Sequence, residues 1–173
     1  MRTLDRAHDG VIRRVDVIHP RQLDETQWKL VVRDAPLVSI DIVVRDRAGR
    51  VLLGIRRNAP AKGYWFVPGG RIVKDESLDD AFLRITSAEI NLPLARRDAA
   101  FLGVYEHFYA DNVFGESGFG THYVAMGYEV SVPAALDDLP LAQQDEYRWW
   151  PTTELLGSDR VHPNTKEFFQ APP

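Results

Sequence analysis

The sequence contains no cysteine, and this absence excludes a whole group of functions. Disulfide bonds, thiolate nucleophiles and zinc sites with cysteine ligands all need a sulfur that the chain does not have. Long apolar runs are also missing, so we expect no membrane partner. The opening stretch, MRTLDRAHDGVIRRVDV, carries scattered charges without an apolar segment. It does not resemble a signal peptide, and we expect a cytoplasmic protein.

An excess of positive charge is missing as well. Lys and Arg together number 21, against 25 for Asp and Glu, which gives a formal net charge of −4. We therefore expect no nucleic-acid partner, although a local basic pocket for a small anion is compatible with this composition. The length of 173 residues suits one domain whose core is large enough to fold without covalent cross-links.

What the chain does contain is a series of strand patterns around one strong helix pattern. β-Branched, aromatic or alternating segments predict strands at 37–46, 50–57, 65–73, 101–109, 121–130 and 145–151. The first two of these form a hairpin around the turn DRAG. Short helices are expected within 22–36, ending before Pro36, and at 163–170. This order of elements indicates an α/β fold, a sandwich with a mixed sheet.

The strong helix carries a carboxylate on the side that faces the core. Ser77, followed three positions later by Asp80, has the pattern of a capping box, so we expect the helix to begin at Leu78. An apolar stripe with helical spacing follows, made of Leu78, Ala81, Phe82, Ile85, Ala88 and Leu92. Glu89 lies in the middle of this stripe. Because a buried carboxylate without a partner costs several kcal/mol, Glu89 is either paired with a core arginine or bound to a metal ion.

This helix and the loop before it resemble a known motif. Gly70, Glu76, Arg84 and Glu89 stand at the spacing of the Nudix hydrolase motif, G-x5-E-x7-R-E-U-x-E-E-x-G-U. The segments PLVSIDIVV, LLGIRRNAPAKGYWFVPGGR, ESLDDAFLRITSAE, GVYEHFY, THYV and DEYRWW closely resemble the GDP-mannose mannosyl hydrolase branch of that superfamily. The resemblance implies a Nudix fold, an α/β/α sandwich with a mixed sheet. It divides the chain into an N-terminal arm, 1–28, and a Nudix hydrolase domain, 29–170.

Three positions depart from the general Nudix motif. Ile85 and Ala88 stand where it has glutamates, and Asn91 stands where it has glycine. The resembling branch also lacks the two glutamates, so the site is interpreted as remodelled for a different reaction. Asn91 can adopt the left-handed conformation that a helix end requires.

The resemblance implies Mg²⁺-dependent hydrolysis of GDP-mannose, or of a related GDP-hexose, to GDP and free sugar. In that branch water attacks the anomeric carbon with inversion, and the proteins are homodimers that act on a small-molecule nucleotide sugar. Mn²⁺ is expected to substitute for Mg²⁺. The physical chemistry agrees with this reaction, since a departing diphosphate needs only its growing negative charge neutralised, which one Mg²⁺ and arginines can do.

The resemblance also assigns roles to individual residues. The implied metal ligands are the backbone carbonyl of Gly69 and the side chains of Glu89 and Gln143. The implied catalytic residues are Asp41, Arg56, Arg71 and Gln144. The implied substrate-binding residues are Arg84, His107 and Tyr123, with the alternative that Arg84 braces the carboxylates.

Gln144 stands where the branch characteristically has a histidine that is regarded as the general base. A glutamine amide cannot accept a proton near neutral pH. Three alternatives follow: Asp145, Asp41 or His122 takes over this role, the enzyme runs slowly, or the site binds a sugar nucleotide without turnover. Cleavage of the pyrophosphate bond is a further alternative, against which the missing glutamates argue.

Overall fold

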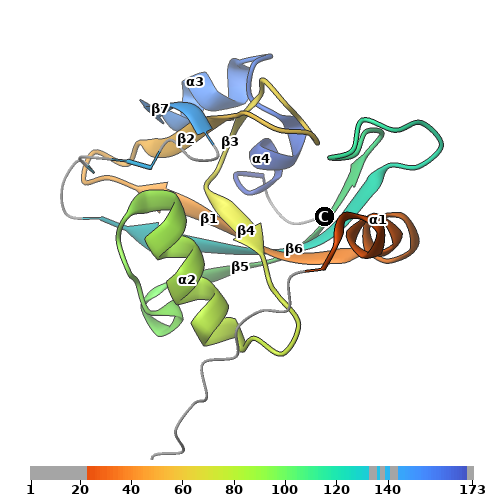
Figure 1. Cartoon of the computed structure of the whole chain (residues 1–173). Coiled ribbons are helices and arrows are strands. Elements are labelled where there is room, and N and C mark those ends of the chain that lie inside the picture. The colour runs from red at the N-terminus through yellow and green to blue at the C-terminus, as the bar shows by residue number, and fades with distance from the viewer. Residues whose placement is uncertain (1–22, 133–135, 137–138, 141–143, 171–173) are drawn as a thin grey trace, which may run out of the picture.

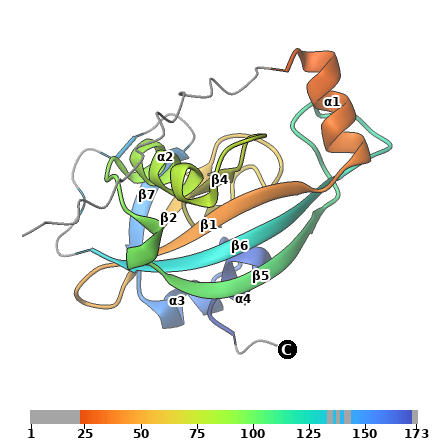
Figure 2. The ribbon, with the colours of Figure 1, turned by 90° about the horizontal axis from the view of Figure 1, so that it is seen from below.

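The architecture is a mixed β-sheet with helices on both faces (Figures 1 and 2). The computed structural model describes residues 23–132, 136, 139–140 and 144–170. The strands are β1 (Leu37–Arg45), β2 (Val51–Arg56), β3 (Trp65–Phe66), β4 (Gly69–Arg71), β5 (Ala100–Tyr109), β6 (Thr121–Ser131) and β7 (Gln144–Trp150). The helices are α1 (Glu25–Asp34), α2 (Leu78–Ile90), the 3₁₀ turn η1 (Arg96–Asp98), α3 (Thr152–Gly157) and α4 (Pro163–Glu167).

Strand β1 is the centre of the sheet, because it pairs with three other strands, β2, β4 and β6. It runs parallel to β6 along its whole length, from Leu37 opposite Tyr123 to Arg45 opposite Ser131. Its other edge is divided. Arg45 pairs with Val51 of β2, whereas residues 39–41 pair with β4. The predicted hairpin is therefore present, but β2 leaves β1 early and continues against β3 and β7.

The segment 65–73, predicted as one strand, is two strands with different partners. Trp65 and Phe66 pair with β2, and residues 69–71 pair with β1. Pro68, which cannot donate a hydrogen bond, stands between the two pairings, and its carbonyl accepts from the Ile42 amide at 2.8 Å. The chain thus crosses from one partner strand to the other across the opening that β2 leaves.

The two faces of the sheet carry separate apolar layers. α2 covers one face, where Phe82 and Ile85 pack with Ile40 and Ile42 of β1. α3 and α4 cover the other face, where a second layer includes Trp65, Trp150, Leu155 and Phe168. Figure 2 shows α2 on one side of the strands and α3 and α4 on the other. This arrangement confirms the predicted α/β/α sandwich with a mixed sheet.

α2 begins and ends as the sequence predicted. Ser77 accepts a hydrogen bond from the Asp80 amide at 3.2 Å, and Asn91 ends the helix in the left-handed region at φ 53°. Two members of the predicted core stripe lie at its margins, since Leu78 and Ala88 are exposed to solvent. Ala88 lines a cavity instead of the core. The stripe is therefore narrower than the sequence indicated.

The shorter helices agree with the sequence in part. α1 ends at Asp34, before Pro36, and its first turn is capped by Asp24, which accepts from the Gln27 amide at 2.8 Å. The helix predicted at 163–170 is present as α4. α3 and η1 were not predicted. Within the described residues, no helix is long and apolar enough to cross a bilayer.

Candidate active site

One cavity, of about 340 Å³, opens where β2 diverges from β1, and it collects side chains from β1, β2, β4, β5, β6, β7 and α2. Nine of the residues predicted for the site lie on its wall: Asp41, Arg56, Gly69, Arg71, Arg84, Glu89, His107, Tyr123 and Gln144. Gln143, the tenth, lies outside the described residues. Positions far apart in the sequence therefore meet in one place.

Glu89 is the buried carboxylate at the α2 side of the cavity. It is 4% exposed, and burial raises its pKa to about 7 against the opposing effects of the Arg56 charge and the Gln144 amide. The Tyr147 hydroxyl donates to the Glu89 carbonyl at 2.9 Å and holds this end of the helix. No ion pair in the described part of the chain involves Glu89. Glu89 therefore lies near the charge of Arg56 without a direct ion pair, and its carboxylate lines the cavity.

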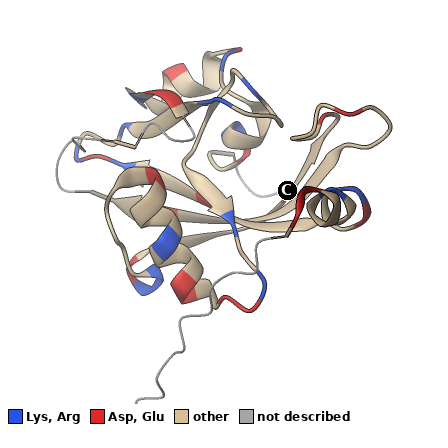
Figure 3. Cartoon of the chain, in the orientation of Figure 1, with Lys and Arg blue, Asp and Glu red and all other residues tan. Residues whose placement is uncertain are grey.

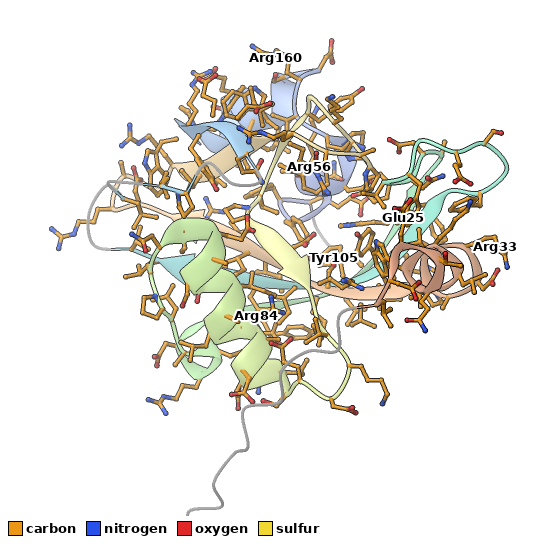
Figure 4. All side chains as sticks on the ribbon, viewed as in Figure 1. Glu25, Arg33, Arg56, Arg84, Tyr105 and Arg160 are labelled. Atoms are coloured by element: carbon orange, nitrogen blue, oxygen red, sulfur yellow. The ribbon has the colours of Figure 1, made fainter. Side chains whose placement is uncertain are left out.

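Arg84 is paired with Glu76. Its guanidinium donates to both carboxylate oxygens, at 2.6 and 2.8 Å, and to the Arg71 carbonyl at 2.9 Å. The hydrogen bond from Arg84 is also the main reason why the pKa of Glu76 is lowered. Figure 4 shows Arg84 on α2. This geometry favours the bracing alternative, in which Arg84 ties the β4–α2 connection together instead of binding an anion.

Arg56 and Arg71 are different, because no carboxylate is paired with either of them in the described residues. Each guanidinium lies over an aromatic ring instead. Arg56 Cζ is 5.3 Å from the centroid of Phe66, and Arg71 Cζ is 3.7 Å from the centroid of Trp28. Both positive charges act on the Tyr123 phenol, whose pKa burial raises. The cavity wall thus offers two available guanidinium groups and one phenol to an anion.

Asp41 and His107 form a second polar group at the cavity wall. His107 Nδ1 lies 3.8 Å from Asp41 Oδ2, and His107 Nε2 lies 3.7 Å from a Glu167 carboxylate oxygen. Burial lowers the pKa of His107 to about 4 and raises the pKa of Asp41 to about 7. His107 is therefore a neutral imidazole at neutral pH, and these contacts are not full ion pairs.

The structure distinguishes between the candidates for the missing base. Asp145 is paired with Arg57 at 2.7 Å, and its side chain is 53% exposed. His122 stacks on Phe108, with ring centroids 4.4 Å apart, beside the end of α1. Neither side chain lines the cavity, whereas Asp41 does. Asp41 is therefore the candidate that the geometry retains.

Gln144 fits into the cavity wall because the neighbouring residue on β2 is a glycine. Its side chain is buried against Gly54 of β2, where an added Cβ would come within 2.8 Å of the Gln144 Cδ. Gln144 Oε1 has no hydrogen-bond partner among the described residues. An amide in this position can donate to a carboxylate and can offer an oxygen to a ligand, but it cannot take up a proton.

Sequence reasoning missed Tyr109 and Asn58, which also line the cavity. Tyr109 follows His107 by two positions on β5, so strand alternation alone places both on the same face. Burial raises the pKa of Tyr109, so it is a neutral phenol that can donate a hydrogen bond. Asn58 lies in a loop, and no sequence pattern distinguishes it.

The donors in the cavity suit a hard cation with few protein ligands. The described residues contain no group of three or more His, Asp or Glu side chains that could hold a metal ion. Mg²⁺ commonly takes only one or two carboxylates from a protein and keeps water and substrate phosphate as its other ligands. The buried carboxylate of Glu89 and the nearby Gly69 backbone on the same cavity wall fit such a cation, and a transition metal bound by a histidine cluster does not fit the described residues.

Comparison with known proteins defines the class. The model of the NUDIX domain matches residues 35–171, and the chain belongs to the Nudix family. The family is one of hydrolases. Low-salt glycan biosynthesis protein Agl8 of Haloferax volcanii is 40% identical over 150 residues, which cover 87% of this chain and 90% of that protein.

Solved structures agree with the fold. A MutT Nudix hydrolase from Burkholderia pseudomallei has a TM-score of 0.63 at 26% identity, over 78% of this chain and 96% of that one. The Nudix domain of NrtR from Shewanella oneidensis, in complex with ADP ribose, has a TM-score of 0.59 at 22% identity, over 85% and 97%. The fold around the cavity is thus the Nudix fold.

Gly69 gives the first testable prediction. A Cβ at this position would lie 2.6 Å from Asp41 Oδ1 and 2.8 Å from the Ile40 carbonyl oxygen. We expect Gly69→Ala to push β4 away from β1 and to lower the free energy of unfolding by about 1–3 kcal/mol, measured by urea denaturation. Gly157→Ala is the control, because a Cβ there meets nothing within 4 Å. Equal stability of the two variants would contradict the close approach at Gly69.

Proposed function

We propose that this Nudix protein hydrolyses GDP-mannose, or a related GDP-hexose, to GDP and free sugar, with water attacking the anomeric carbon and inverting it. The observation that carries the proposal is the pattern of charge in the cavity. Of the α2 residues that line the cavity, Ile85 and Ala88 are apolar and Glu89 alone carries a carboxylate. The guanidinium groups of Arg56 and Arg71 line the same cavity. One carboxylate on α2 together with two arginines suits a departing diphosphate better than it suits an activated water beside phosphorus.

Arg56 and Arg71 bind the diphosphate in this proposal. A guanidinium pairs with phosphate oxygens through two parallel hydrogen bonds and stays charged at any working pH. The Tyr123 phenol, whose pKa the charges of Arg56 and Arg71 lower against the effect of burial, donates a hydrogen bond to the diphosphate. When bound, Mg²⁺ or Mn²⁺ neutralises part of the negative charge that develops on the diphosphate, and its proposed ligands are Glu89, the Gly69 carbonyl and Gln143.

Asp41 acts as the general base. The water oxygen forms the new bond to the anomeric carbon, and one of its protons passes to the Asp41 carboxylate. The bond between that carbon and the bridging phosphate oxygen breaks, and its electron pair leaves with GDP. Neutral His107, at 3.8 Å from Asp41, orients this carboxylate or a sugar hydroxyl. No general acid is required, because a diphosphate is already a good leaving group.

Two further properties belong to the proposal. We place the protein in the cytoplasm and expect it to act as a homodimer. Large apolar side chains on the sheet-edge strand β5 support an interface, since Phe101, Val104 and Phe108 are 57%, 61% and 67% exposed. The name of the relative Agl8, a glycan biosynthesis protein, agrees with a sugar nucleotide as the substrate.

The bond that breaks can be identified with labelled water. We expect incubation with GDP-mannose and Mg²⁺ in ¹⁸O-water to place the label in mannose, because attack at carbon leaves the phosphate oxygens unchanged. Mass spectrometry of both products measures this. Label in a phosphate group would instead establish pyrophosphate cleavage. Tight binding without turnover over hours would establish a binding protein. This outcome is tested because Gln144 replaces the histidine that is regarded as the general base.

The base is tested by comparing two aspartates. We expect Asp41→Asn to lower kcat by about 10²–10⁴-fold, the usual contribution of a general base. Asp145→Asn, which alters only the surface pair with Arg57, should change kcat less than threefold (about 0.7 kcal/mol). GDP binding by calorimetry should be equal in both variants, which separates loss of the base from loss of the nucleotide site. A large loss in Asp145→Asn with retained activity in Asp41→Asn would transfer the role to Asp145.

A further inference from the structure

α1 lies outside the segment that matches the NUDIX domain model, yet one of its side chains contacts Arg71, a residue of the cavity wall. The matched segment begins at residue 35, whereas α1 covers residues 25–34. The indole of Trp28 lies under the guanidinium of Arg71, with 3.7 Å between Arg71 Cζ and the ring centroid. This distance is well inside the range of about 6 Å for a cation–π contact. A helix that the family model does not include therefore supports a residue of the cavity wall.

α1 is held in place independently of this contact. Val32 is buried, and Lys29 forms an ion pair with Glu116 in the loop between β5 and β6. Figure 1 shows α1 next to the β5–β6 hairpin, at the end of the sheet where β1 begins. Trp28 is thus mounted on an anchored helix, and its ring provides a fixed surface beside β4.

The stacking leaves the hydrogen-bonding capacity of Arg71 unused. A guanidinium that stacks on a ring uses its face, and all its N–H groups point outward in the plane. Arg84 provides the contrast, because it donates three hydrogen bonds, two to Glu76 and one to the Arg71 carbonyl. A long arginine side chain also loses conformational freedom when it binds an anion, and a side chain already held on a ring loses less.

We propose that Trp28 is a positioning residue, which holds Arg71 ready to bind the diphosphate of the nucleotide substrate. The inference rests on the proposed function only for the identity of this ligand. α1 is then part of the binding site and not merely an extension that precedes the domain. The position of the indole predicts that Trp28 contributes to diphosphate binding through Arg71 and has no effect without it.

The test is a double-mutant cycle on GDP binding, measured by calorimetry with Mg²⁺. We expect Trp28→Leu to weaken GDP binding roughly 3- to 30-fold, the range of a cation–π contact. Trp28→Phe, which keeps an aromatic face, should recover most of this loss. In an Arg71→Ala background, Trp28→Leu should have no further effect, because the group that it positions is gone. In steady-state assays Trp28→Leu should raise KM more than it lowers kcat.

Arg33→Ala is the matched control on the same helix, since the Arg33 guanidinium is exposed and pairs with the neighbouring Asp34, away from Arg71. It should leave GDP binding within twofold of the unmodified protein. Equal losses from Trp28→Leu with and without Arg71, or no rescue by phenylalanine, would overturn the inference. The cycle measures binding, not turnover. Coupling between Trp28 and Arg71 without hydrolysis would therefore support the inference and contradict the proposed reaction. Hydrolysis without this coupling would support the reaction and contradict the inference.

Discussion

The divided edge of β1 is the constraint on which the site depends. β1 pairs with β2 at one end of this edge and with β4 towards the other, so β2 diverges from β1 between the two pairings. The opening exposes Asp41 on β1, and the close approach of Gly69 keeps β4 tight against it. Without that division, β2 would continue along β1, and the cavity wall would be filled by an ordinary sheet.

The second determinant of the site is which of its charged side chains are paired with a counter-ion within the protein. Positive and negative side chains are interspersed over the molecule, as Figure 3 shows for one view, so the net charge says little about the cavity. Within it, the bidentate pair between Arg84 and Glu76 neutralises the charge of one guanidinium. Arg56 and Arg71 lie on aromatic rings and keep their donors. Packing against Phe66 and Trp28 thus provides two arginines where counter-ions would have cancelled them.

Much of this could be predicted from the sequence, because the signals are local. The capping pattern at Ser77 and the left-handed Asn91 define α2 from neighbouring residues alone. The split at Pro68 and the stack of Trp28 on Arg71 could not be predicted, since both depend on partners distant in the chain. The general base could not be identified from the sequence for the same reason. His122 and Asp145 were reasonable candidates by residue type, and only the fold shows that they do not line the cavity.

The central claim is that the departing diphosphate, and not a nucleophile beside phosphorus, receives the positive charge in this site. A crystal structure with GDP and Mn²⁺ tests it most directly, because the anomalous signal of Mn²⁺ locates the cation. The account predicts the cation at Glu89 and the Gly69 carbonyl, with the diphosphate between Arg56 and Arg71. A cation bound away from Glu89, or a diphosphate that contacts neither arginine, would contradict it.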